Sequence, residues 1–184
     1  MRPYTLLDVF ADEPLAGNQL AVVHEADGLS EGIMLGFAQE TRLAETTFVQ
    51  APRADGADYR VRIWTVAEEV PFAGHPSLGT ALAVALRRAE SEVTYVQETH
   101  AGLQPVSVMH DRAWASMLQE PADLGDEFDA RHVMAAAGLE AADAHPSLPA
   151  QMVSTGLPAL LAPVAEPSAL GRIRPDRAVI EALD

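Results

Sequence analysis

The stretch that decides the fold runs from Phe72 to Gly79 and reads FAGHPSLG. A glycine and a histidine stand directly before Pro76, and an apolar stretch follows as far as Arg88. Proline suits the first position of a helix, because the N–H group that it lacks would have no partner there. We therefore predict a helix that begins at Pro76 and buries apolar residues at helical spacing, which are Leu78, Ala81, Leu82 and Ala85.

The start of this predicted helix is also a candidate anion-binding site. Free backbone N–H groups and the positive end of the helix dipole point to one place at such a junction. Gly74 lets a ligand approach the backbone closely, and His75 adds a side chain that titrates near neutral pH. The alternative interpretation is a plain turn between a loop and a helix, with a histidine on the surface.

Glu45 is the second candidate functional residue. It precedes the β-branched and aromatic residues of Thr46–Val49, which are typical of a strand. A carboxylate in this mostly apolar setting can be desolvated, which raises its pKa towards that of a general acid or base. The alternative is an ordinary glutamate at the edge of a strand.

Two further local patterns predict secondary structure. The alternation of apolar residues with arginines over Tyr59–Ile63 is typical of a half-buried strand. Ser30 suits the N-cap of a helix. The apolar face of that helix would contain Ile33, Phe37 and Ala38.

Several motifs in a fixed order resemble one known family. The chain carries LAETTFV at 43–49, DYRVRIWT at 58–65 and PFAGHP at 71–76, preceded by Gly17-Asn18 and followed by STGLP at 154–158. Together they closely resemble the PhzF-like family, named for an isomerase of phenazine biosynthesis. The resemblance covers the chain nearly end to end. It implies an α+β fold like that of diaminopimelate epimerase, in which strands wrap around a central helix.

The resemblance also implies an activity, which is proton transfer on a small anionic, carboxylate-bearing substrate without metal, nucleotide or organic cofactor. Glu45 would carry the proton from one carbon to another. Gly74 and His75 would hold the carboxylate with their backbone, and the His75 side chain would bind the substrate or assist the transfer. Asn18 and Ser77 are weaker candidates for substrate contacts. The family often has serine before the glutamate, and this chain has alanine there.

Composition narrows the partners that we expect. Lys and Arg total 12 against 27 Asp and Glu, so the formal net charge is −15, which opposes non-specific binding to nucleic acid or an anionic membrane. The sequence has no cysteine, so the paired thiols that diaminopimelate epimerase uses are excluded; Gly74 stands at the matching place. The six histidines lack the spacing of a metal site. No secretory signal or membrane-spanning stretch is visible, and a cytoplasmic location is the expectation.

A faint internal repeat suggests two halves, 1–118 and 119–184. The run that begins at Gly17 resembles the run that begins at Gly156, because each glycine precedes apolar residues. If the second copy of the repeat begins at Gly156, its equivalent of Glu45 would fall on the last residue. Its equivalent of Gly74 would fall beyond the end of the sequence. We therefore expect an incomplete second half and a homodimer or a complementary chain. The alternative function is that of a noncatalytic remnant or one subunit of a split protein.

Overall fold

In the computed structural model, which describes residues 1–119 and 121–183, the chain forms two compact units with a boundary after Gln119. The first unit contains an eight-stranded sheet. Seven strands follow one another across it in the order β1 (Tyr4–Val9), β2 (Asn18–Val23), β3 (Glu45–Gln50), β4 (Tyr59–Trp64), β6 (Glu92–Thr99), β7 (Gly102–Met109) and β8 (Trp114–Ser116). The short strand β5 (Glu69–Val70) pairs with β4.

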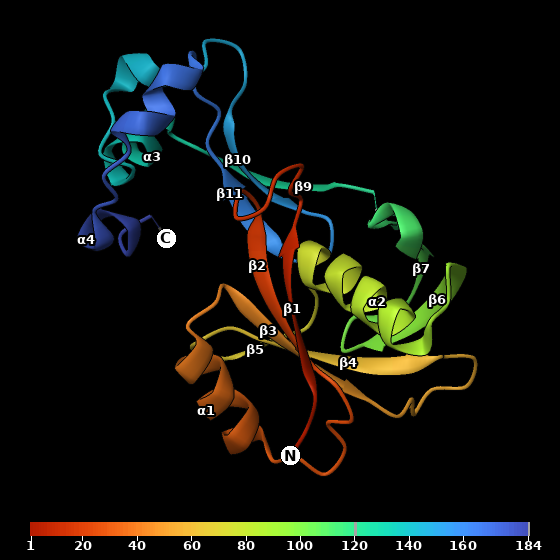
Figure 1. Ribbon diagram of the computed structural model, residues 1–184. Helices are drawn as coiled ribbons and strands as arrows, with labels where there is room; N and C mark the ends of the chain where they lie inside the picture. The colour runs from red at the N-terminus through yellow and green to blue at the C-terminus, as the bar shows by residue number, and fades with distance from the viewer. Residues whose placement is uncertain (120, 184) are drawn as a thin grey trace. The chain divides into compact units, whose positions relative to one another are not determined.

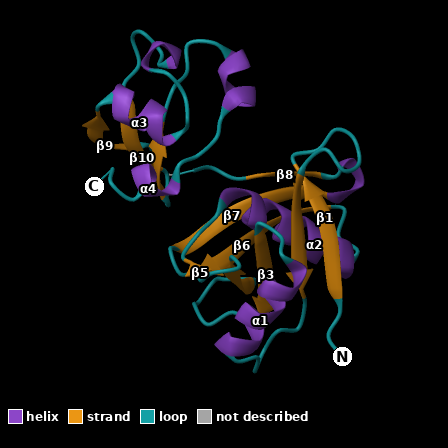
Figure 2. Cartoon of the chain, turned by 90° about the vertical axis from the view of Figure 1, so that its left-hand side faces the viewer, coloured by secondary structure: helices purple, strands orange, loops and turns teal. Residues whose placement is uncertain are grey.

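The sheet of the first unit curls around one helix. Strands β2 and β3 are parallel, as are β4 and β6, and the other pairs are antiparallel. Helix α2 (Gly74–Arg88) contacts both end strands, β1 and β8, and the strands between them (Figures 1 and 2). Helix α1 (Glu31–Thr41) packs against β3 and β4 on the outer face of the sheet. The predicted α+β fold with strands around a central helix is confirmed.

Helix α2 is buried on most sides, as its composition predicts, but it begins two residues earlier than expected. Ala73 is extended (φ −155°, ψ 140°) and forms the N-cap, so Pro76 is the third helical residue and not the first. The third position tolerates proline for the same reason as the first, because its N–H would have no partner within the helix. The buried apolar residues of α2 pack against Tyr59, Val61 and Ile63 of β4.

The curled sheet stays open between its two ends. Among the described strands, β1 pairs only with β2, and β8 pairs only with β7. A groove of about 560 Å³ lies between them, lined by Leu7 and Val9 of β1, Trp114 of β8, and Leu78 and Leu82 of α2. These two leucines are therefore only half-buried, although the sequence predicted them in the core.

Strand β4 is buried over its full length and not half-buried. Arg60 and Arg62, which alternate with the core residues, are each only 8% exposed. Arg62 forms ion pairs with Glu69 and Glu31, and Arg60 lies 3.6 Å from a carboxylate oxygen of Glu98. The outer face of this strand is thus covered by ion pairs, which alternation alone does not reveal.

Helix α1 follows the prediction at its start and departs from it on its buried face. The Ser30 hydroxyl accepts a hydrogen bond from the N–H of Ile33 at 3.4 Å, so the predicted N-cap is confirmed. The buried residues of α1 are Met34 and Ala38, and Ile33 is 57% exposed. Ile33 lies to one side of the face that packs on Phe48, and its predicted burial is wrong.

The second unit contains a three-stranded antiparallel sheet in the order β11 (Pro158–Leu161), β10 (Ala150–Ser154) and β9 (Asp123–Phe128). Its helices are α3 (Ala130–Ala136), capped by Asp129, and α4 (Arg177–Ile180), capped by Asp176. A small core forms around Met134, Leu139 and Ala169. Over 1–119 and 121–183, no helix is long and apolar enough to cross a membrane.

Candidate active site

Three residues that are far apart in the sequence converge in the first unit. Asn18 is the first residue of β2, Glu45 is the first of β3, and His75 is the second of α2. Because β2 and β3 are parallel, with Leu20 opposite Glu45, both strands begin at the same edge of the sheet. His75 Nε2 lies 3.3 Å from Glu45 Oε2, and His75 Nδ1 lies 3.3 Å from Asn18 Nδ2. The predicted catalytic pair is thus brought together with Asn18.

Burial shifts the pKa of both catalytic candidates. The side chains of Glu45 and His75 are 20% and 10% exposed. Desolvation by burial raises the pKa of Glu45, because it disfavours the ionised carboxylate. The same effect lowers the pKa of His75, because it disfavours the imidazolium. Burial therefore favours a neutral imidazole beside a carboxylate that binds a proton more readily than usual, an arrangement that suits proton transfer.

The facing atoms of Glu45 and His75 are close but not aligned as a hydrogen bond. Both are buried, and among the described residues neither Oε2 nor Nε2 has a partner with hydrogen-bond geometry. Buried polar atoms are normally satisfied, so an unsatisfied facing pair is a feature that needs an explanation. Catalytic hydrogen bonds often become well aligned only when substrate is bound. A substrate atom beside this pair would engage both groups.

The start of α2 offers backbone donors next to His75. Ala73 provides no side-chain cap, and within the described part of the chain no acceptor is recorded for the N–H groups of Gly74 and His75. Among the described residues, a Cβ atom at Gly74 would meet just the side-chain amide nitrogen of Gln119, at 3.8 Å. The backbone is therefore accessible, and free N–H groups at a helix start attract an anion.

Ser77, expected as a weaker substrate contact, is not part of this arrangement. Its side chain is fully buried, and its hydroxyl donates to the carbonyl oxygen of Ala73 at 2.8 Å. The hydroxyl thus closes the first turn of α2. We therefore leave Ser77 out of the substrate contacts proposed below.

Two features of the site have no signal in the sequence. Gln119 reaches Gly74 only through the fold, at the end of the first unit. Thr47 of β3 and Thr80 of α2 are fully buried, and their hydroxyl oxygens are 2.8 Å apart. This hydrogen bond ties the strand that carries Glu45 to the helix that carries His75.

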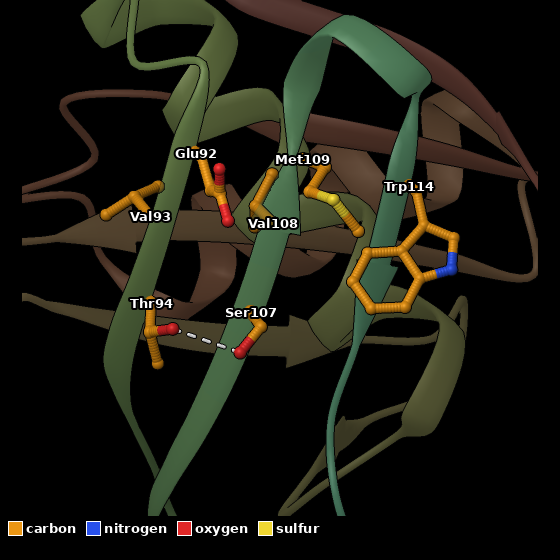
Figure 3. Close-up of a pocket in the computed structure, with 7 residues that line it drawn as sticks. All are labelled: Glu92, Val93, Thr94, Ser107, Val108, Met109 and Trp114. Carbon is orange, nitrogen blue, oxygen red and sulfur yellow. Dashed lines mark hydrogen bonds between the residues drawn. The ribbon is translucent and has the colours of Figure 1, made fainter.

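A second hollow of the first unit lies elsewhere. Figure 3 shows it over β6, β7 and β8, with Thr94 and Ser107 hydrogen-bonded to each other and Trp114 at one side. Its volume is about 340 Å³. None of its lining residues belongs to the arrangement of Asn18, Glu45 and His75, so we do not assign the activity to it.

The sequence matches a known family and a curated relative. The model of the phenazine biosynthesis-like protein family (PhzC-PhzF) matches residues 7–184. The chain is 34% identical over 179 residues to a trans-2,3-dihydro-3-hydroxyanthranilate isomerase of Pseudomonas aeruginosa. That match covers 96% of this chain and 62% of the relative.

Solved structures agree with these similarities. A protein from Pseudomonas aeruginosa described as a predicted epimerase is 38% identical, with a TM-score of 0.88, over 100% of this chain and 66% of that one. A hydroxyproline epimerase from Agrobacterium vitis, 17% identical with a TM-score of 0.59, covers 88% of this chain and 53% of that one and shows the fold alone. The epimerase-like fold is thus confirmed, and the chain spans less than two thirds of these relatives.

Proposed function

This chain belongs to the phenazine biosynthesis-like (PhzF) family, and from that membership we propose that it acts as an isomerase in which Glu45 moves a proton between two carbons of a small carboxylate-bearing substrate. The observation that carries the proposal is the buried approach of Glu45 Oε2 to His75 Nε2 at 3.3 Å, beside the uncapped start of α2. This arrangement provides a base, a neighbouring donor and an anion-binding backbone in one place.

Each group has a role in the proposed reaction. The ionised Glu45 carboxylate takes a proton from a substrate carbon, and the electron pair left behind moves into the conjugated system of the substrate. The protonated Glu45 then returns the proton to another carbon, so the product is an isomer and the enzyme is restored. The N–H groups of Gly74 and His75 bind the substrate carboxylate and stabilise the negative charge that develops.

The proposed substrate class follows from the relative and the site together. The Pseudomonas relative is named for trans-2,3-dihydro-3-hydroxyanthranilate, a small molecule with one carboxylate. We propose a substrate of this kind for the present chain. With a formal net charge of −15, the protein attracts such an anion only through local donors, which the start of α2 supplies.

The test compares two glutamate variants on the substrate of the relative. Glu45→Gln keeps the shape of the side chain but removes the base, so kcat should fall by about 10²-fold or more with little change in stability. Glu40→Gln, which changes an exposed glutamate of α1, should leave kcat unchanged. Product formation can be followed by proton NMR in deuterated buffer. Normal turnover by Glu45→Gln would remove Glu45 from the mechanism.

The pH profile gives an independent check. A general base works only when ionised, so kcat/KM should fall as the pH drops through the pKa of Glu45, which burial raises above the usual range of a glutamate. If the folded wild-type chain converts no substrate at any pH, the isomerase proposal fails for this chain, and the noncatalytic alternative takes its place.

A further inference from the structure

The two ring nitrogens of His75 face different partners, and one partner can only donate. The side-chain nitrogen of Asn18 lies 3.3 Å from Nδ1, and a carboxylate oxygen of Glu45 lies 3.3 Å from Nε2. An amide nitrogen carries hydrogens and has no acceptor capacity. With the amide nitrogen facing the ring, Nδ1 accepts the hydrogen bond and does not carry the proton of the neutral imidazole.

We propose that Asn18 is a positioning residue that holds His75 in the tautomer protonated at Nε2 and so directs this proton towards Glu45 and the substrate. Asn18 then acts through His75, and it need not touch the substrate. The sequence predicted a substrate contact for Asn18, so this is a different role for the same residue. The catalytic consequence rests on the proposed function, whereas the tautomer does not.

The fold holds Asn18 in place through the residue before it. A Cβ atom at Gly17 would collide with the carbonyl oxygen of Val9, so the turn into β2 approaches β1 as closely as only glycine permits. The N–H of Gly17 also donates to Asp8 Oδ1 at 3.1 Å. The backbone at the start of β2 is thus fixed, and the Asn18 amide has a defined direction.

The tautomer matters for the neutral form of His75. Burial lowers the pKa of His75 and so favours this form, in which the ring carries one proton. With that proton on Nε2, a positive hydrogen faces the Glu45 carboxylate. With the proton on Nδ1, a lone pair would face the carboxylate, and one of the two groups would have to bind another proton. Asn18 therefore favours an ionised Glu45, as a general base requires.

Few other charges bear on this pair. In the described residues, Glu45 of β3 is the titratable group recorded against the His75 side chain, and Asp8 of β1 holds the turn before Asn18. A change in Asn18 should therefore act on His75 and Glu45 without a competing titration. This simplicity makes the inference open to a direct test.

The test is to determine the tautomer of His75 by NMR on the full chain labelled with ¹⁵N-histidine. Asn18 is the single asparagine in the sequence, so selective labelling of asparagine gives one side-chain amide signal. In the wild type we expect an unprotonated Nδ1, a protonated Nε2, and a coupling from the amide to Nδ1. Protonation of Nδ1 in the wild type at neutral pH would overturn the inference.

Two variants extend this test. Asn18→Asp replaces the donor by an acceptor of the same shape and should move the proton to Nδ1, and Asn18→Leu should give a mixture of tautomers. Gln19→Glu is the matched control, because it makes the same change of charge at the next, exposed residue of β2, whose side chain points to the opposite face. An Asn18→Asp or Asn18→Leu protein with the wild-type tautomer would also overturn the inference.

Catalysis provides a separate readout. In Asn18→Asp, the acidic limb of kcat/KM should move to higher pH by about 1 unit or more, because the positive hydrogen on Nε2 would no longer face the carboxylate of Glu45. Gln19→Glu should leave the limb in place. If the tautomer is as predicted but the wild-type chain shows no turnover, the proposed function fails and the role of Asn18 in setting the tautomer stands. An unmoved limb in an active Asn18→Asp enzyme would refute the catalytic role.

Discussion

Replacing one of the two buried threonines that join β3 to α2 should destabilise the first unit more than replacing both. Thr47 and Thr80 are both fully buried, and among the described residues the recorded partner of each hydroxyl is the other, at 2.8 Å. Thr47→Val keeps the shape and branching of the side chain but leaves the Thr80 hydroxyl buried without a partner. That should lower the free energy of unfolding by about 1–3 kcal/mol, and Thr80→Val should do the same.

The double variant separates this reasoning from a simple loss of contacts. Replacing both hydroxyls removes the unsatisfied group, so the double variant should lie within about 1 kcal/mol of the wild type. Both tryptophans, Trp64 and Trp114, belong to the first unit, so urea unfolding followed by tryptophan fluorescence reports on that unit. The midpoints should shift at constant slope. If the double variant shows the sum of the single losses, the hydroxyl pair does not behave as a buried hydrogen-bonded unit.

Two further predictions concern stability. Glu69→Gln should lower the free energy of unfolding by about 3 kcal/mol, because the buried Arg62 loses the more buried of its two carboxylate partners. Glu31→Gln removes the exposed partner and should lower it by about 1 kcal/mol or less. Equal losses in urea titrations would contradict this prediction. Gly79→Ala should destabilise the first unit by about 1–3 kcal/mol, because a Cβ atom there would lie 2.6 Å from a leucine methyl carbon. Gly36→Ala should stabilise α1 by up to about 1 kcal/mol, because the space around Gly36 is open and alanine favours a helix. Thermal melts that rank the two alanine variants the other way would refute this pair.

The sequence predicted the elements whose pattern is local. The helical spacing of α2, the cap at Ser30 and the strand that follows Glu45 depend on neighbours within a few positions, and each of these features is present. Leu78 and Leu82 are only half-buried, because the groove beside them depends on distant strands. The pairing of Glu45 with His75 was reached through family motifs, because nothing local places residue 45 beside residue 75. The exact start of α2 was missed because proline is tolerated at more than one position of a first turn.

Other features could not be predicted, because residues far away in the sequence determine which side chains are buried and which strands pair. Arg60 and Arg62 read as the exposed side of a strand, and they are buried because carboxylates from β5, β6 and α1 cover them. Strand β9 has no apolar pattern that would predict a strand, because its residues are mostly polar and exposed. It is a strand through its pairing with β10, and hydrophobic periodicity carries no trace of that pairing.

The candidate site depends on where three elements begin, and this makes it sensitive to the turns before them. Asn18 and Glu45 open two parallel strands, and His75 lies in the first turn of the helix that those strands enclose. Side chains alternate between the faces of a strand, so a shift of one residue at the start of β2 would turn the Asn18 amide away from His75. The close approach of Gly17 to β1 prevents that shift. The geometry at His75 is therefore set as much by the backbone of this turn as by the polar side chains that carry out the chemistry.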